Sequence, residues 1–233
     1  LPQGVLHAAV SRTSRAEGAL PMVPRFLDNH LLVLDKPWGL LTQPSGTSED
    51  SLEARGKAWL KEYFSKPGAV FLEAVHRIDR PVGGVVLFAR TSKALSRLNT
   101  SQREGRFRKK YRALVHGCPG ESGRLVDWLV HGDHRAEVVK AGADGARKCA
   151  LEWHLLERRG DFSLLEIDLE TGRYHQIRAQ LGKAGFPIAG DVLYGGRKVP
   201  QAPPDGIALC SWSIAFPHPV GGEEMVITSG MEL

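Results

Sequence analysis

Short apolar segments recur along the chain, and most of them have the pattern of β-strands. In residues 165–169 apolar and acidic side chains alternate, as expected for a strand with one buried face. Residues 84–89 are apolar without interruption, which suits a strand buried on both faces. The pattern predicts six strands, at residues 31–34, 84–89, 110–116, 149–155, 162–169 and 209–215.

A second pattern, with apolar residues three or four positions apart, predicts helices between these strands. Ser92 is a suitable N-cap for one of them, and Gly105 and Gly185 are suitable stops for two. The predicted helices cover residues 51–64, 92–104 and about 174–184. Strands and helices do not alternate regularly, and residues 158–161 suit a hairpin. We expect an α+β fold, with a mixed, mainly antiparallel β-sheet flanked by helices.

One polar segment stands at the entrance of an apolar strand. Residues 76–80 read His-Arg-Ile-Asp-Arg and lead through Pro81 into the strand at 84–89. Asp79 therefore lies between two arginines, and it is expected to be ionised because nearby positive charge favours the charged form. From these residues alone, a catalytic carboxylate and an ordinary surface ion pair are about equally good interpretations.

A second polar segment, Thr171 to Arg178, joins the strand at 162–169 to the third helix. Thr171 is a candidate N-cap, and Arg178 is expected in the first turns of that helix. A buried arginine there needs an anion, and we expect that anion to be Asp79.

Composition and charge limit the class of protein. The chain has 233 residues, 42% of them hydrophobic and 24% charged, and no apolar run long enough for a membrane helix. Three widely spaced cysteines form no metal-binding pattern and suggest a reducing compartment. We expect an N-terminal tail or lead-in at residues 1–24, without a signal peptide, and one catalytic domain at residues 25–233.

The net charge is +5, and basic residues are concentrated in one segment. Such a run is most often a solvated face, but here Phe107 and Tyr111 are interleaved with it, which favours a nucleic-acid surface. The basic residues of the run are Arg103, Arg106, Arg108, Lys109, Lys110 and Arg112.

Four motifs in order resemble the RluA-type family of RNA pseudouridine synthases. They are an opening strand with a Lys-Pro-x-Gly turn (residues 28–40), a catalytic motif (76–91), a Lys-x-Tyr strand (108–115), and a closing signature (171–178 with 190–196). The resemblance implies the family's fold and its reaction, isomerisation of uridine to pseudouridine in ribosomal or transfer RNA.

The resemblance also implies roles for individual residues. Asp79 is the catalytic aspartate, Tyr111 packs against the flipped base, and Arg178 is the partner of Asp79. The expected substrate-binding residues are His76, Arg77, Arg80, Ile177, Lys109 and Lys110. The reaction adds no group and changes no redox state, so we expect no cofactor and no metal. We expect a cytoplasmic monomer whose partner is an RNA stem-loop, with no membrane association.

The chain departs from the family beside the expected site. Val82-Gly83 replaces a common Thr-Ser, and Gln43-Pro44 replaces a common His-Pro. These departures keep a second hypothesis open, an RNA-binding or RNA-folding module with weak or lost catalysis. A third hypothesis, a glycoside hydrolase, needs a second carboxylate near Asp79, for which Glu170 is the candidate.

Overall fold

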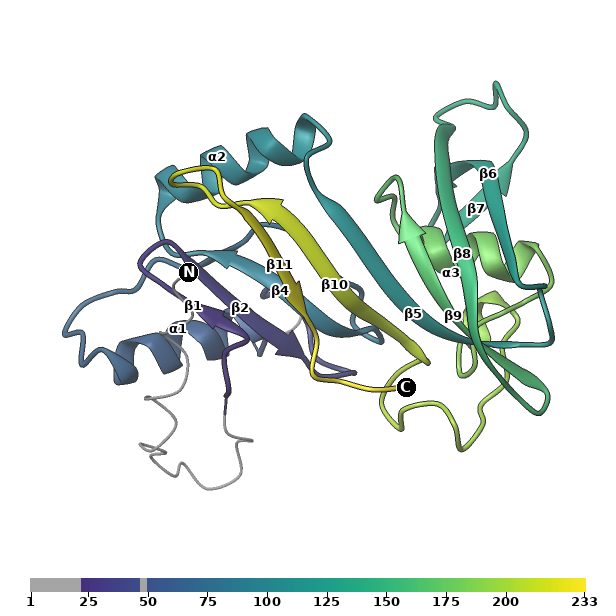
Figure 1. Cartoon of the computed structure of the whole chain (residues 1–233), viewed down its shortest axis with the longest axis horizontal. Helices are drawn as coiled ribbons and strands as arrows, with labels where there is room; N and C mark the ends of the chain where they lie inside the picture. The colour runs from purple at the N-terminus through teal and green to yellow at the C-terminus, as the bar shows by residue number, and fades with distance from the viewer. Residues whose placement is uncertain (1–21, 47–49) are drawn as a thin grey trace.

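A computed structural model describes residues 22–46 and 50–233, and the strands of this part form one continuous sheet (Figure 1). Of the predicted N-terminal tail, residues 1–21 lie outside the described residues. The strands are β1 (Phe26–Leu27), β2 (Leu31–Lys36), β3 (Glu73–Ala74), β4 (Gly83–Ala89), β5 (Arg108–His116), β6 (Ser122–His131), β7 (Ala136–Val139), β8 (Arg147–Arg159), β9 (Phe162–Leu169), β10 (Leu209–Pro217) and β11 (Glu224–Thr228).

Strand β5 lies in the middle of the sheet, whose order is β1-β2-β4-β10-β5-β9-β8-β6-β7 (Figure 1). Strand β11 pairs with β10, and β3 pairs with β4. All neighbouring strands are antiparallel except β4 and β10, which are parallel. The predicted mixed, mainly antiparallel sheet is therefore confirmed.

The six predicted strands correspond to β2, β4, β5, β8, β9 and β10. Strands β6, β7 and β11 were not predicted, because many of their side chains are exposed and no continuous buried face marks them in the sequence. The short strands β1 and β3 also gave no signal, since each contains only two residues.

Helices α1 (Leu52–Tyr63) and α2 (Ser92–Arg103) cover opposite faces of the part of the sheet that contains β2 and β4. One buried cluster joins Leu60 of α1 to Leu34 and Phe88, and another joins Leu98 of α2 to Val33. Helix α3 (Gln176–Lys183) packs on the part beyond β5, where Ile177 and Leu181 enter the first cluster. No helix of the described residues is long and apolar enough to cross a membrane.

Two predicted caps differ from the structure by local hydrogen bonding. Thr91, not Ser92, caps α2, because its hydroxyl accepts from the Ala94 N–H. Thr171 does not cap α3, which begins at Gln176 after a left-handed residue, His175. The Thr171 hydroxyl instead donates to the side chain of Gln176 and accepts from the Ala150 N–H, so it ties the turn to β8.

The departure at Val82-Gly83 is explained by packing. Val82 is buried in the main core, and Gly83 lies under the indole of Trp38, where an added Cβ would be 2.6 Å from a ring carbon. The indole N–H of Trp38 donates to the Leu209 carbonyl, which fixes the ring in this position. A serine at position 83 and the tryptophan at position 38 therefore exclude each other sterically.

We predict that Gly83→Ser lowers the free energy of unfolding by about 1–3 kcal/mol, because it overpacks the space under Trp38. In a Trp38→Ala background the same substitution should cost much less, since the ring is gone. Denaturant unfolding of the four proteins measures this coupling. An equal cost of Gly83→Ser in both backgrounds would show that Trp38 does not explain the glycine.

Candidate active site

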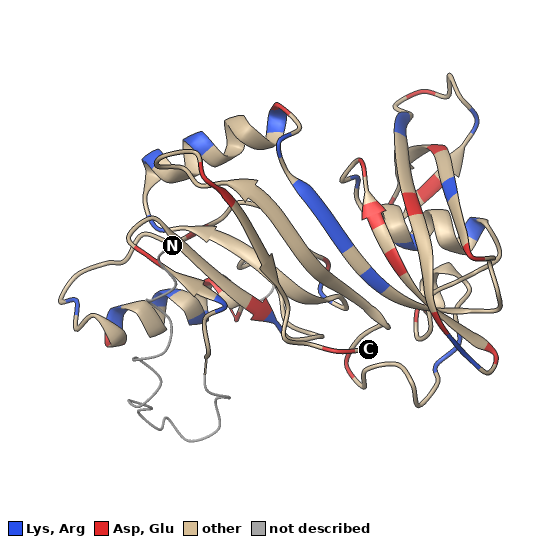
Figure 2. Ribbon diagram, viewed as in Figure 1, with Lys and Arg blue, Asp and Glu red and all other residues tan. Residues whose placement is uncertain are grey.

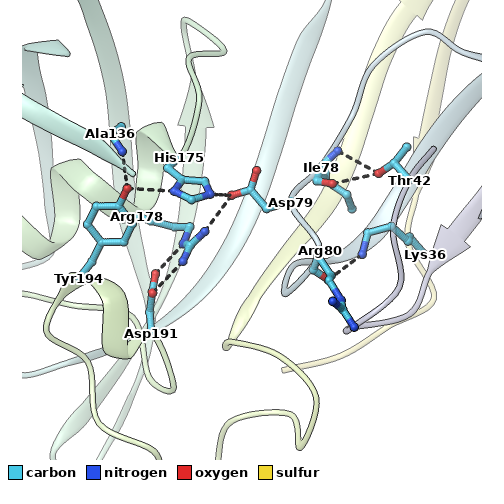
Figure 3. Close-up of polar contacts among 10 residues, drawn as sticks. All are labelled: Lys36, Thr42, Ile78, Asp79, Arg80, Ala136, His175, Arg178, Asp191 and Tyr194. Atoms are coloured by element: carbon cyan, nitrogen blue, oxygen red, sulfur yellow. Dashed lines mark hydrogen bonds and ion pairs between the residues drawn. The ribbon is translucent and has the colours of Figure 1, made fainter. Parts of the chain in front are cut away.

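Asp79 lies on the loop between β3 and β4 (Figure 3). This loop stands where the part of the sheet that contains β2 and β4 meets the part beyond β5. Its neighbours Ile78 and Val82 are buried in the main core, and the Val82 N–H donates to the Asp79 carbonyl, which closes the turn. The Asp79 side chain is 25% exposed, so the carboxylate is anchored at its base and accessible at its tip.

Two polar side chains hold the backbone on either side of Asp79 (Figure 3). The Thr42 hydroxyl donates to the Ile78 carbonyl at 2.9 Å and accepts from the Ile78 N–H at 3.3 Å. Lys36, at the end of β2, donates through Nζ to the Arg80 carbonyl at 3.1 Å. Both residues belong to the segment around the Lys-Pro-x-Gly turn, so that motif holds the Asp79 loop in place.

Lys36 is fully buried, and its Nζ also donates to the carbonyls of Pro37 and Leu40. Burial lowers the pKa of Lys36 to about 7, while the negative charge of Asp79 opposes this shift and Arg80 adds to it. The role of Lys36 is structural, since its Nζ donates to three backbone carbonyls, and one of them, that of Arg80, directly follows Asp79.

Arg178, the third residue of α3, lies between two carboxylates (Figure 3). Its Nε and one terminal nitrogen donate to Asp191 at 2.7 and 2.9 Å, and its other terminal nitrogen donates to Asp79 Oδ2 at 3.2 Å. Burial acts to lower the pKa of Arg178, but the hydrogen bonds and charges of Asp191 and Asp79 prevail and raise it. The expected ion pair of Asp79 with Arg178 is present, and Asp191 is an additional, shorter-range partner.

Asp191 belongs to the closing signature, but the sequence did not predict it as a site residue. A tight loop before the 3₁₀ helix η1 (Val192–Tyr194) presents its carboxylate, which is almost fully buried. Gly190 has a positive φ of 86°, and an added Cβ on Gly196 would lie 2.1 Å from the Ile188 carbonyl oxygen. The glycines of this signature are therefore required by the loop that orients Asp191.

His175 is a second contact of the Asp79 side chain, which the sequence did not indicate. Its left-handed backbone, with φ of 50°, is strained for a residue other than glycine. Its Nε2 lies 3.4 Å from Asp79 Oδ2, and its Nδ1 lies 2.9 Å from the Tyr194 hydroxyl (Figure 3). The Tyr194 hydroxyl also accepts from the Ala136 N–H, so the ring of His175 lies between Asp79 and a hydroxyl that β7 holds in place.

The two carboxylate oxygens of Asp79 have different surroundings. Oδ2 faces both Arg178 and His175, whereas Oδ1 accepts no hydrogen bond from the residues that the structure describes. Burial lowers the pKa of His175, so the neutral ring leaves Arg178 as the cation in contact with Asp79. The site thus holds one oxygen in place and leaves the other available to a bound molecule.

Tyr111 of β5 is buried beside this carboxylate. It pairs across the sheet with Ile167 of β9 and Ser211 of β10, and its side chain enters the main core. Burial raises the pKa of Tyr111, and the negative charge of Asp79 raises it further. At neutral pH this side chain is therefore a protonated phenol.

The other predicted residues of the catalytic motif have different environments. His76 is buried, and its Nε2 accepts from the Leu87 N–H, so it supports the loop from inside. Arg77 is exposed. Arg80 is also exposed, and its Nε donates to the Gly39 carbonyl at 2.8 Å, which links it to the Lys-Pro-x-Gly turn.

Several basic residues of the run 103–112 are in ion pairs with carboxylates. Figure 2 shows basic residues along β5 and acidic residues on neighbouring strands. Arg106, Arg108 and Lys110 form ion pairs with Glu104, Glu224 and Glu166. Lys110 points to the face of β5 opposite Tyr111, because it shares a register with Asp168 while Tyr111 shares one with the buried Ile167. Burial lowers the pKa of Lys109 to about 8. Ile177 is a core residue next to Arg178.

The glycoside hydrolase hypothesis gains no support from the geometry. Glu170 is directed away from the site, since both its oxygens accept from Arg124 at 2.8 and 2.9 Å. Among the described residues, no three His, Cys, Asp or Glu side chains form a group that could hold a metal ion. Two histidines, His131 and His134, are close in the sequence. His134 lies between β6 and β7 and pairs with its neighbour Asp133.

Comparison with known proteins gives matches in sequence and in fold. Residues 30–183 match a family model described as RNA pseudouridylate synthase. A protein of Chloroflexus aurantiacus, described as an uncharacterized RNA pseudouridine synthase, is 38% identical over 70% of this chain and 52% of its own length. A ribosomal large subunit pseudouridine synthase D of Xanthomonas campestris is 31% identical over 91% of this chain and 67% of its own.

The fold is similar to that of the human RNA pseudouridylate synthase domain containing 4. The TM-score is 0.73 at 20% identity, over 90% of this chain and 88% of the human one. The chain spans about half to two thirds of the length of the curated relatives that it matches.

Asp191→Asn should lower the free energy of unfolding by about 3 kcal/mol, because it leaves the buried Arg178 without one of its two anions. Asp168→Asn is the matched control, since it removes the more distant of the two carboxylates that pair with the partly exposed Lys110, and it should cost less than about 1 kcal/mol. Denaturant unfolding measures both. Equal, small losses in the two variants would contradict the structural role given to Asp191.

Proposed function

Because the chain belongs to the RluA-type family of RNA pseudouridylate synthases, we propose that it isomerises uridine to pseudouridine in structured RNA. The observation that supports this most directly is the asymmetry at Asp79. One oxygen faces Arg178 and His175, the other accepts no hydrogen bond from the described residues, and the side chain is 25% exposed. A fixed carboxylate with one free oxygen suits chemistry at a ribose carbon.

The reaction breaks the bond between C1′ and N1 of uridine and then joins C1′ to C5 of the same base. The free Oδ1 of Asp79 is the reacting oxygen in this proposal. Attack on C1′, attack on the base and removal of the C2′ proton all require the same thing, an unprotonated carboxylate close to the nucleoside. Arg178 and His175 hold the opposite oxygen and so fix the direction of Oδ1.

Tyr111 is proposed to pack against the flipped uracil. Its raised pKa makes it a poor base at neutral pH, which supports a role in contact rather than in removal of the C5 proton. Flipping a base out of its stack costs a few kcal/mol, and contacts with the ring offset part of that cost. Ile177, buried beside Arg178, adds an apolar wall behind the base.

The proposed substrate is ribosomal or transfer RNA, in the cytoplasm. Relatives named for the ribosomal large subunit make ribosomal RNA the first substrate to test. Arg77, two residues from Asp79, is exposed, and its guanidinium is in no ion pair with a residue that the structure describes. We propose that Arg77 contacts a phosphate near the target uridine. No residue of the site is proposed to hold a cofactor or a metal.

The test uses transcripts of ribosomal and transfer RNA made in vitro, which contain no pseudouridine. The wild-type protein should convert one or a few uridines, which mass spectrometry or carbodiimide mapping identifies. Asp79→Asn should form no pseudouridine while binding the transcript with a Kd within about twofold of wild type, because the amide cannot act as a nucleophile or base.

Asp168→Asn serves again as the control and should keep full activity, since its carboxylate lies on the face of the sheet opposite Tyr111. Pseudouridine formation by Asp79→Asn and Asp79→Ala would refute the proposed mechanism. Binding of RNA by the wild-type protein without any turnover would favour an RNA-binding module instead.

A further inference from the structure

A row of aromatic rings leads outward from the Asp79 site. The Tyr174 ring stacks on the His175 ring, with centroids 3.9 Å apart and an interplanar angle of 17°. His131, at the end of β6, lies 4.4 Å from Tyr174 in a tilted arrangement. His175 at the inner end contacts Asp79, and both Tyr174 and His131 are exposed at the outer end.

The exposure of Tyr174 is not explained by the fold. Its side chain is 41% exposed and belongs to none of the buried clusters, although it lies next to the most buried helix of the site. Partial burial and the charge of Asp79 raise the pKa of its hydroxyl, while Arg178 acts in the opposite direction. The exposed part of the ring offers apolar surface at the rim of the site, on which a nucleobase can stack.

The Tyr174 ring is also held in a fixed orientation by its stacking partner. Its neighbour His175 is fixed on both nitrogens, by Asp79 and by Tyr194, and sits on a strained left-handed backbone. A ring stacked on a fixed ring loses little conformational freedom when a further ring binds to it. Arg173, next to Tyr174, is exposed, and its guanidinium is in no ion pair within the described part of the chain.

We propose that Tyr174 and His131 form a stacking platform for an unpaired nucleobase adjacent to the target uridine. This inference rests on the proposed function and adds a base-binding position to it. Aromatic rings bind bases through their π-faces with little sequence preference, and the free guanidinium of Arg173 supplies a contact for the neighbouring phosphate. The platform holds the flanking nucleotide while the uridine is turned toward Asp79.

The first measurement separates stacking from catalysis. The probe is a uridine-free single strand of about 12 alternating adenosines and cytidines, compared with an abasic strand of the same length. Wild type should bind the strand with bases about tenfold more tightly than the abasic strand. Tyr174→Ala should lose most of this preference, and Tyr174→Phe should keep it because the ring remains.

The matched control is Tyr63→Ala. Tyr63 is 42% exposed and also stacks on a neighbouring ring, Trp59, but it lies at the end of α1, in a different part of the molecule from α3 (Figure 1). This variant should bind both strands as wild type does. A base preference that survives in Tyr174→Ala, or that falls equally in Tyr63→Ala, would overturn the platform.

The second measurement uses the full transcripts. Tyr174→Ala should raise the KM about tenfold or more and leave kcat within about threefold, because stacking binds the flanking base and takes no part in bond breaking. A loss confined to kcat would overturn the platform. Failure of the proposed function appears differently, as absence of pseudouridine with the wild-type protein, and the uridine-free strand still tests the platform in that case.

Discussion

The site depends on one buried interaction, the placement of the Arg178 guanidinium between Asp79 and Asp191. Asp79 comes from the loop between β3 and β4, whereas Arg178 and Asp191 come from α3 and the loop after it, beyond β5. A buried guanidinium that lost either partner would keep one anion but would be left with unsatisfied donors, which costs on the order of 1–3 kcal/mol. The interaction therefore fixes the two parts of the molecule against each other at Asp79.

The two carboxylates have different tasks because their surroundings differ. Asp191 accepts two hydrogen bonds from the fork of Arg178 and is almost fully buried, so it orients the arginine and is closed to solvent. Asp79 accepts one, at a longer distance, and keeps an accessible oxygen. Lys36 and Thr42 add to this by fixing the backbone on both sides of Asp79, so the carboxylate is oriented through its main chain as well.

The sequence predicted the elements that bury continuous apolar faces, and it predicted the pairing of Asp79 with Arg178 from charge and burial. It did not predict β6 and β7, whose exposed side chains resemble a loop, although Ala136 of β7 supports Tyr194. It also missed His175, because its role follows from a left-handed backbone that no local pattern announces. In the sequence Gly83 was only a departure from the family pattern, and the position of Trp38 explains it.

We propose that the fork geometry of Arg178, and not its charge alone, holds the Asp79 carboxylate in the orientation that the proposed reaction requires. The most direct test is the single-turnover rate of Arg178→Lys at saturating RNA. Lysine keeps the charge but cannot bind Asp191 with two donors while reaching Asp79. The account predicts a fall in rate of about 100-fold or more, with RNA binding unchanged. A rate within a few-fold of wild type would contradict it.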